Sequence, residues 1–168
     1  MPQYHSEATT FRQLWSSKLW VNASQRQKLN AWRPFLRRSY FDADYADARA
    51  ACLGAARAIL NDAAKPLPQT FTRPWAHAFA QISACVVLAY DYQHATGPQD
   101  ALKVEIDMHL DRLAQYAANP MVERGTRLVR DMMRPQQESV LGELPSDLFL
   151  TTELSQLFDS SWLSSNTL

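Results

Sequence analysis

Polar side chains that could act on a small molecule lie along one predicted helix, over residues 74–96. His77, Gln81 and Asp91 share one stripe of that helix, since they follow steps of three and four residues. His77 and Asp91 are the candidate catalytic residues, because imidazole and carboxylate groups serve as general acids and bases. Such a stripe could line a pocket. Because polar groups are seldom buried, we expect instead that His77 and Gln81 point to solvent, and that Asp91 makes a local hydrogen bond near the helix end.

Aromatic residues supply a second candidate site. Aromatic walls with a few polar groups suit an apolar small molecule, and the predicted ligand-binding residues are Trp32, Trp75, His77, Phe79, Gln81 and Tyr90. At helical spacing such rings belong more often to a core than to a pocket. The core is therefore the simpler interpretation, and the pocket is its alternative.

No metal site and no cofactor are predicted. Glu105 and His109 lie four residues apart and could meet on a helix, but two ligands are too few to hold a metal. We interpret them as part of a solvated charged face. Cys52 and Cys85 occur among apolar residues at helical spacing, and we expect both thiols to be buried and unreactive.

Apolar spacing predicts helices along nearly the whole chain, without the sustained alternation that is typical of strands. Thr10 begins a predicted first helix, and Ser24 begins a second that Pro34 ends or kinks. Further helices are predicted over residues 45–64 and 74–96, up to Asn119, up to Pro135, and briefly after Pro145. The longest apolar run, over residues 82–90, places the 74–96 helix at the centre. We therefore predict an all-α fold, a bundle of about five to seven helices, with one domain over residues 1–160 and a frayed tail over 161–168.

Two of these helices carry clear internal signals. The 45–64 helix presents a face of mostly small residues that permits a close approach, formed by Ala48, Cys52, Ala55, Ile59 and Ala63. Asn119 is the predicted N-cap of the helix that follows it, with Pro120 in the first position. This helix is predicted to run through Val122, Leu128 and Met132.

Composition narrows the possible partners. The 168 residues include 17 basic and 17 acidic side chains, and this balance argues against a free-standing nucleic-acid-binding protein. Four glycines include no phosphate-binding loop, and no apolar run is long enough to cross a membrane. The N-terminal ten residues have no apolar leader, so we expect a cytoplasmic or nuclear protein.

Three segments together resemble a known family. They are residues 33–40 (RPFLRRSY), residues 45–60 (YADARAACLGAARAIL) and residues 88–91 (LAYD). In order and spacing they resemble the second half of the fungal-specific transcription factor domain, the regulatory module found behind a binuclear zinc cluster. The resemblance covers residues 31–133, about two thirds of the chain. The six cysteines of the zinc cluster are missing, so the DNA-reading activity of the family is not implied, and the first half of the family's helical domain is missing too.

The resemblance implies a stand-alone helical module that binds an effector or a partner. Helices without their former neighbours would expose apolar faces, which a homodimer, another protein or an apolar small molecule could cover. It also implies that Arg33 and Arg49, at patterned positions of the family, pair with carboxylates inside the fold. One alternative is a small enzyme of secondary metabolism, a cyclase or cycloaddition catalyst acting on an apolar metabolite in an aromatic pocket. A third possibility is a scaffold that binds a full-length regulator.

Overall fold

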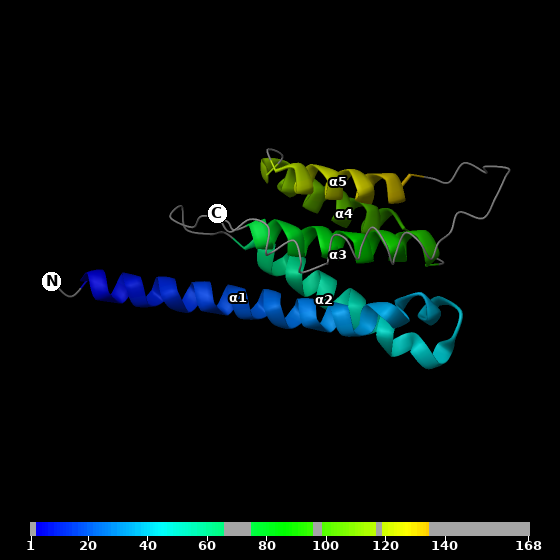
Figure 1. Cartoon of the computed structure of the whole chain (residues 1–168), viewed down its shortest axis with the longest axis horizontal. Helices are drawn as coiled ribbons and strands as arrows, with labels where there is room; N and C mark the ends of the chain where they lie inside the picture. Colours follow the sequence, from blue (N-terminus) through cyan, green and yellow to red (C-terminus); the bar gives the residue numbers. More distant parts are fainter. Residues whose placement is uncertain (1–2, 66–74, 96–98, 117–118, 135–168) are drawn as a thin grey trace. The chain divides into compact units, whose positions relative to one another are not determined.

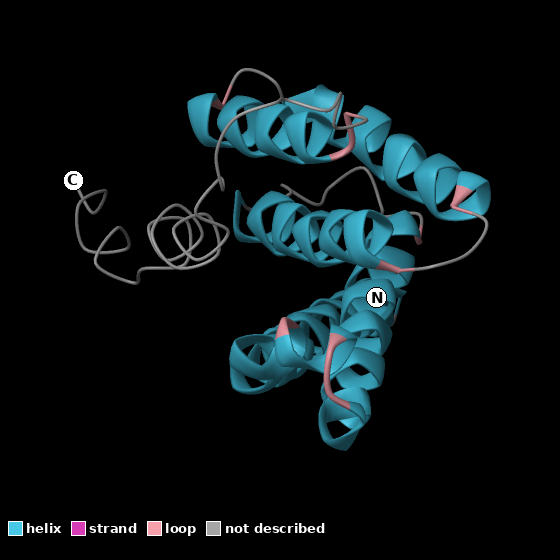
Figure 2. Cartoon of the chain, turned by 90° about the vertical axis from the view of Figure 1, so that its right-hand side faces the viewer, coloured by secondary structure: helices cyan, strands magenta, loops and turns pink. Residues whose placement is uncertain are grey.

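The structure is a computed structural model that describes residues 3–65, 75–95, 99–116 and 119–134; the side chains of residues 3–12, 75 and 76 are outside this description. All of them belong to one compact unit, residues 1–134, and residues 135–168 form a second unit that is not described. The described residues form α-helices and short 3-10 turns, and they include no strand (Figure 2). The all-α prediction is confirmed. The predicted helix after Pro145 and the predicted tail lie outside the described residues, and a single domain reaching residue 160 stays a prediction.

The first helix is continuous where two helices were predicted. α1 spans Gln3–Leu36, with Ser24 and Pro34 both inside it. Ser24 does not cap a new helix, because its hydroxyl donates to the carbonyl of Val21 at 3.1 Å, within the same helix. Pro34 lies in the last turn, where it removes one backbone hydrogen bond, and the helix ends two residues after it. The predicted break between the first two helices is therefore wrong.

α2 spans Ala46–Ala64 and packs along α1 after a connection made of the 3-10 turns η1 (Arg38–Tyr40) and η2 (Ala43–Tyr45). Its buried residues include Ala48, Cys52, Ala55 and Ile59, as the spacing predicted. These small side chains allow the backbones of the two helices to approach closely.

A buried ion pair joins the middle of α1 to the C-terminal end of α2. The Lys18 ammonium donates to the Asp62 carbonyl at 2.9 Å and lies 3.4 Å from Asp62 Oδ2. Lys18 is 4% exposed and Asp62 5%. A second cation, Lys65, lies 3.3 Å from Asp62 Oδ1 at the surface. The pair fixes where along α1 the C-terminal end of α2 lies, and nothing in the sequence pattern indicated it.

α3 spans Trp75–His94 and is the centre of the unit. It contacts α2 on one side and α4 (Asp100–Leu113) and α5 (Pro120–Met132) on the other, so the helices form tiers around it (Figure 1). Every residue from 78 to 91 is buried. The predicted central apolar helix is thereby confirmed.

α5 begins as predicted, and Val122 belongs to its buried face. The side chain of Asn119 accepts a hydrogen bond from the Met121 N–H at 2.9 Å, with Pro120 in the first turn, so the predicted N-cap is confirmed. Leu128 and Met132 are only half-buried. The buried face consists of Val122, Gly125, Thr126 and Val129. Of the three residues by which this helix was predicted, Val122 is therefore buried, while Leu128 and Met132 lie at the edge of the buried face, which Gly125 brings close to Ile82 of α3.

Candidate functional site

The polar stripe of α3 begins against α1. Nδ1 of His77 lies 3.3 Å from the Asn22 amide nitrogen, and the His77 ring lies 5.9 Å from that of Trp15. Gln81 is buried, and its side chain donates to the His77 carbonyl at 3.2 Å. The expectation that His77 and Gln81 point to solvent is therefore wrong. His77 contacts α1, and the Gln81 side chain bonds within α3.

Asp91, at the other end of α3, belongs to a network that spans three elements. Its Oδ1 accepts from the Tyr40 hydroxyl in η1 at 2.7 Å and from Nε of Arg49 in α2 at 2.7 Å. The Arg49 guanidinium also lies 5.0 Å from the centre of the Tyr40 ring. We call these three residues the Asp91 network. The local hydrogen bond expected for Asp91 is thus replaced by two bonds to distant residues, and the expected pairing of Arg49 with a carboxylate is found.

Aromatic rings surround this network. The Tyr40 ring packs against Tyr90 at 5.6 Å and against His94 at 5.3 Å, and the last two stack at 4.1 Å. Burial, and then the hydrogen bond to Asp91, raise the pKa of Tyr40 well above its ordinary value. Tyr40 therefore stays a neutral hydrogen-bond donor at physiological pH.

The two candidate catalytic residues do not meet. Fourteen positions separate His77 from Asp91 on α3, and at 1.5 Å per residue this distance is about 21 Å. A general acid and a general base must both reach the same substrate. The carboxylate of Asp91 is moreover occupied by Arg49 and Tyr40. The described geometry does not favour joint catalysis by this pair.

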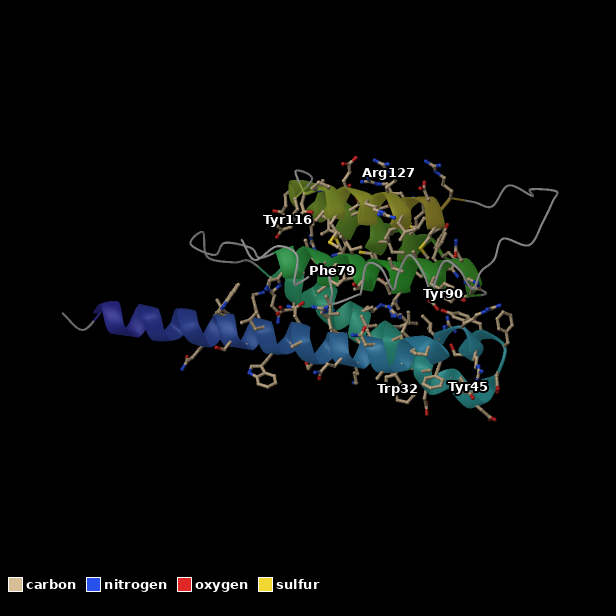
Figure 3. The ribbon with its side chains drawn as sticks, viewed as in Figure 1. Trp32, Tyr45, Phe79, Tyr90, Tyr116 and Arg127 are labelled. Carbon is tan, nitrogen blue, oxygen red and sulfur yellow. The ribbon has the colours of Figure 1, made fainter. Side chains whose placement is uncertain are left out.

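The predicted ligand-binding residues also lie in separate places. Phe79 and Tyr90 lie near opposite ends of α3, and Trp32 lies on α1 (Figure 3). Phe79 is buried beneath the guanidinium of Arg26, 5.2 Å from its ring centre. The side chain of Trp75 lies outside the described residues. The described members of this set do not come together around one ligand.

An exposed aromatic surface forms instead where α1 meets the connection to α2. The Trp32 ring meets Phe35 edge-on at 6.4 Å, and Phe35 stacks on Tyr45 at 5.8 Å. The Arg38 guanidinium lies 5.7 Å from the centre of the Tyr45 ring and donates to the Tyr45 hydroxyl at 3.3 Å. We call Trp32, Phe35, Arg38 and Tyr45 the aromatic patch. Trp32 and Phe35 are each 39% exposed, and Phe41, close by in the chain, is 79% exposed. Trp32 was predicted as a ligand-binding residue. Phe35 follows it by three residues on the same helix and was not, while Arg38 and Tyr45 join the patch only through the turn of the chain.

Neither cysteine has the character of a nucleophile. Both are buried, as predicted. Burial raises the pKa of the Cys85 thiol to about 12 and that of Cys52 to about 11, although the nearby Arg33 partly opposes the second shift. Thiolate attack at physiological pH is therefore disfavoured. The expected pairing of Arg33 with a carboxylate stays a prediction.

His109 is buried where the sequence predicted a solvated face. It is 2% exposed, and its Nδ1 has no hydrogen-bond partner among the described residues. Glu105 turns instead to Arg57 of α2, at 3.3 Å. Within the described part of the chain, no cluster of three or more His, Cys, Asp or Glu side chains could hold a metal ion.

Acid is expected to destabilise the fold through His109. Burial first, and then the Arg112 charge, lower the pKa of His109 below its ordinary 6.5, with Glu105 opposing. The unfolded chain therefore takes up this proton at a higher pH than the folded chain does. We expect the free energy of unfolding, measured in denaturant, to fall as the pH drops below about 6.5. His109→Gln should remove this part of the pH dependence; identical slopes for the two proteins would contradict the assignment.

Comparison with known proteins adds no relative. No protein-family model matches the chain, no curated protein is similar to it, and no solved structure resembles it. Among the described helices, none is long and apolar enough to cross a membrane.

Proposed function

We propose that this chain is a helical interaction module that binds a second copy of itself through the aromatic patch. The observation that carries the proposal is the patch: a row of exposed, mutually packed rings with an arginine at its edge. Aromatic residues and arginine are enriched in protein interfaces and dominate their binding energy. Exposed apolar surface rimmed by polar residues is a common mark of protein–protein interaction sites.

Charge favours a second copy as the partner. Arg38 at one edge of the patch is exposed, and Asp44 and Asp47 beside Tyr45 are exposed as well. In a two-fold symmetric interface each surface meets itself, so a patch that carries both signs can satisfy itself. Arg38 of one copy would then face the carboxylates of the other.

The family resemblance supports an interaction role. Arg49 belongs to the segment 45–60 and Asp91 to the segment 88–91, and these two residues lie 2.7 Å apart. Under this proposal the chain is related to the regulatory domains of fungal zinc-cluster regulators, does not bind DNA itself, and acts in the cytoplasm or nucleus. No described feature favours the alternative of a cyclase.

Trp32→Ala is expected to weaken dimerisation of the full-length chain at least tenfold, which is about 1.4 kcal/mol, because it removes the largest ring of the patch. Sedimentation equilibrium over about 1 to 100 μM measures the dissociation constant. Trp20→Ala is the matched control: Trp20 is 74% exposed on the same helix, but twelve residues or about 18 Å away. A parent chain that stays monomeric throughout, or equal effects of both variants, would overturn the proposal.

Charge reversal tests whether the interface is symmetric. Arg38→Glu and Asp44→Lys should each weaken self-association, because like charges then meet across the two-fold axis. An equimolar mixture of the two variants should form a heterodimer, since opposite charges meet again at both edges. Failure of the mixture to associate would exclude this pairing of charges, while the Trp32 result would still decide whether the patch is an interface.

A further inference from the structure

We infer that Asp91 fixes the geometry of the aromatic patch from α3, by holding the connection that carries part of it. This inference rests on the proposed function. Asp91 touches no member of the patch through a described hydrogen bond, so it acts as a positioning residue. It acts on the patch through its hydrogen bond to Tyr40.

The connection between α1 and α2 has little apolar anchorage of its own. Neither of its 3-10 turns contains a buried residue. At its start, the hydroxyl of Ser39 donates to the Leu36 carbonyl at 2.6 Å, a local bond. Its contact with α3 is made by Tyr40, through the 2.7 Å hydrogen bond to Asp91 and the ring packing on Tyr90.

Two members of the patch flank this anchor. Arg38 precedes Tyr40 by two residues, and Tyr45 follows it by five. The 3.3 Å bond between Arg38 and Tyr45 therefore closes a loop that contains Tyr40. When Tyr40 anchors this loop to α3, Arg38 stays over the ring of Tyr45 in the arrangement that the second copy would bind. A loose loop must be ordered when the partner binds, and this ordering opposes association.

The burial of Asp91 makes the anchor durable. Its side chain is 7% exposed, and Arg49 holds the same Oδ1 at 2.7 Å. Arg49 of α2 thus holds the carboxylate in place whether or not Tyr40 is bound. The carboxylate is therefore a preformed acceptor for the Tyr40 hydroxyl. Loss of the Tyr40 hydroxyl leaves Asp91 paired with Arg49, so the test need not unfold the protein.

Tyr40→Phe in the full-length chain tests the inference, because it removes the hydroxyl and keeps the ring. We expect the dimer dissociation constant to rise about three- to tenfold, with faster amide hydrogen exchange over residues 37–45 than in the parent. Exchange in α4 and α5 should stay unchanged, which a general loss of stability would not allow. Tyr92→Phe, the same substitution on α3 outside the Asp91 network, should change neither quantity.

The outcomes separate this inference from the function on which it rests. If the parent chain is a monomer, the proposed dimer is wrong, and the exchange measurement alone decides whether Asp91 orders the connection. If the parent dimerises and Tyr40→Phe alters neither the dissociation constant nor exchange over residues 37–45, the positioning role is overturned and the dimer stands.

Discussion

Asp62→Ala is expected to lower the free energy of unfolding by about 3–5 kcal/mol, the largest effect of any single substitution considered. The change leaves the ammonium of Lys18 in the contact between α1 and α2, 4% exposed and without its carboxylate. A buried charge that loses its partner keeps its full desolvation cost. The Asp62 carbonyl, 2.9 Å from the ammonium, survives the substitution and keeps the effect within this range. Denaturant unfolding monitored by circular dichroism measures it.

A double variant separates the value of the pair from the cost of breaking it. Lys18→Met with Asp62→Leu removes both charges, and we expect its stability to lie close to that of the parent. Asp107→Ala is the surface control. It breaks the 2.7 Å ion pair between Asp107 and Lys103, whose two side chains are each about half exposed. The free energy of unfolding should fall by no more than about 0.5 kcal/mol. A loss at Asp62→Ala as small as this control would show that solvent reaches Lys18.

The helices were predictable wherever local signals and tertiary packing agree. The face of small residues predicted α2, and the long apolar run predicted α3. Asn119 caps α5, as its residue type predicted. α1 was predicted as two helices because Ser24, in isolation, is a typical N-cap residue that begins a new helix. Packing along α2 stabilises one continuous helix, and such tertiary contacts outweigh weak local preferences.

The candidate site was harder to predict, because its contacts join residues far apart in the chain. Asp91 was singled out and Arg49 was expected to pair, but only the fold shows that they pair with each other and with Tyr40. Lys18 and His109 belong to residue types that are mostly exposed, so a single sequence gives no reason to bury them. Their burial depends on partners and neighbours that become visible only in three dimensions.

Gly125→Ala is expected to destabilise the protein by about 2–3 kcal/mol, although alanine is the better helix former. A Cβ at position 125 would lie 2.7 Å from Cγ2 and 2.9 Å from Cδ1 of Ile82, on the facing side of α3. Ile82 is buried, and a β-branched side chain in a helix has one strongly preferred rotamer, so it cannot swing aside. Gly54→Ala is the matched control, because a Cβ there meets no atom within 4 Å. We expect that variant to be more stable than the parent by about 0.5–1 kcal/mol.

The Ile82→Ala background tests the cause. It removes the methyl groups that the new Cβ would strike, so Gly125→Ala should there be neutral or stabilising by up to about 1 kcal/mol. A change of sign between the two backgrounds would show that the close approach of α3 and α5 requires a glycine at this position. An equal loss in both backgrounds would mean that the substitution acts elsewhere than at Ile82.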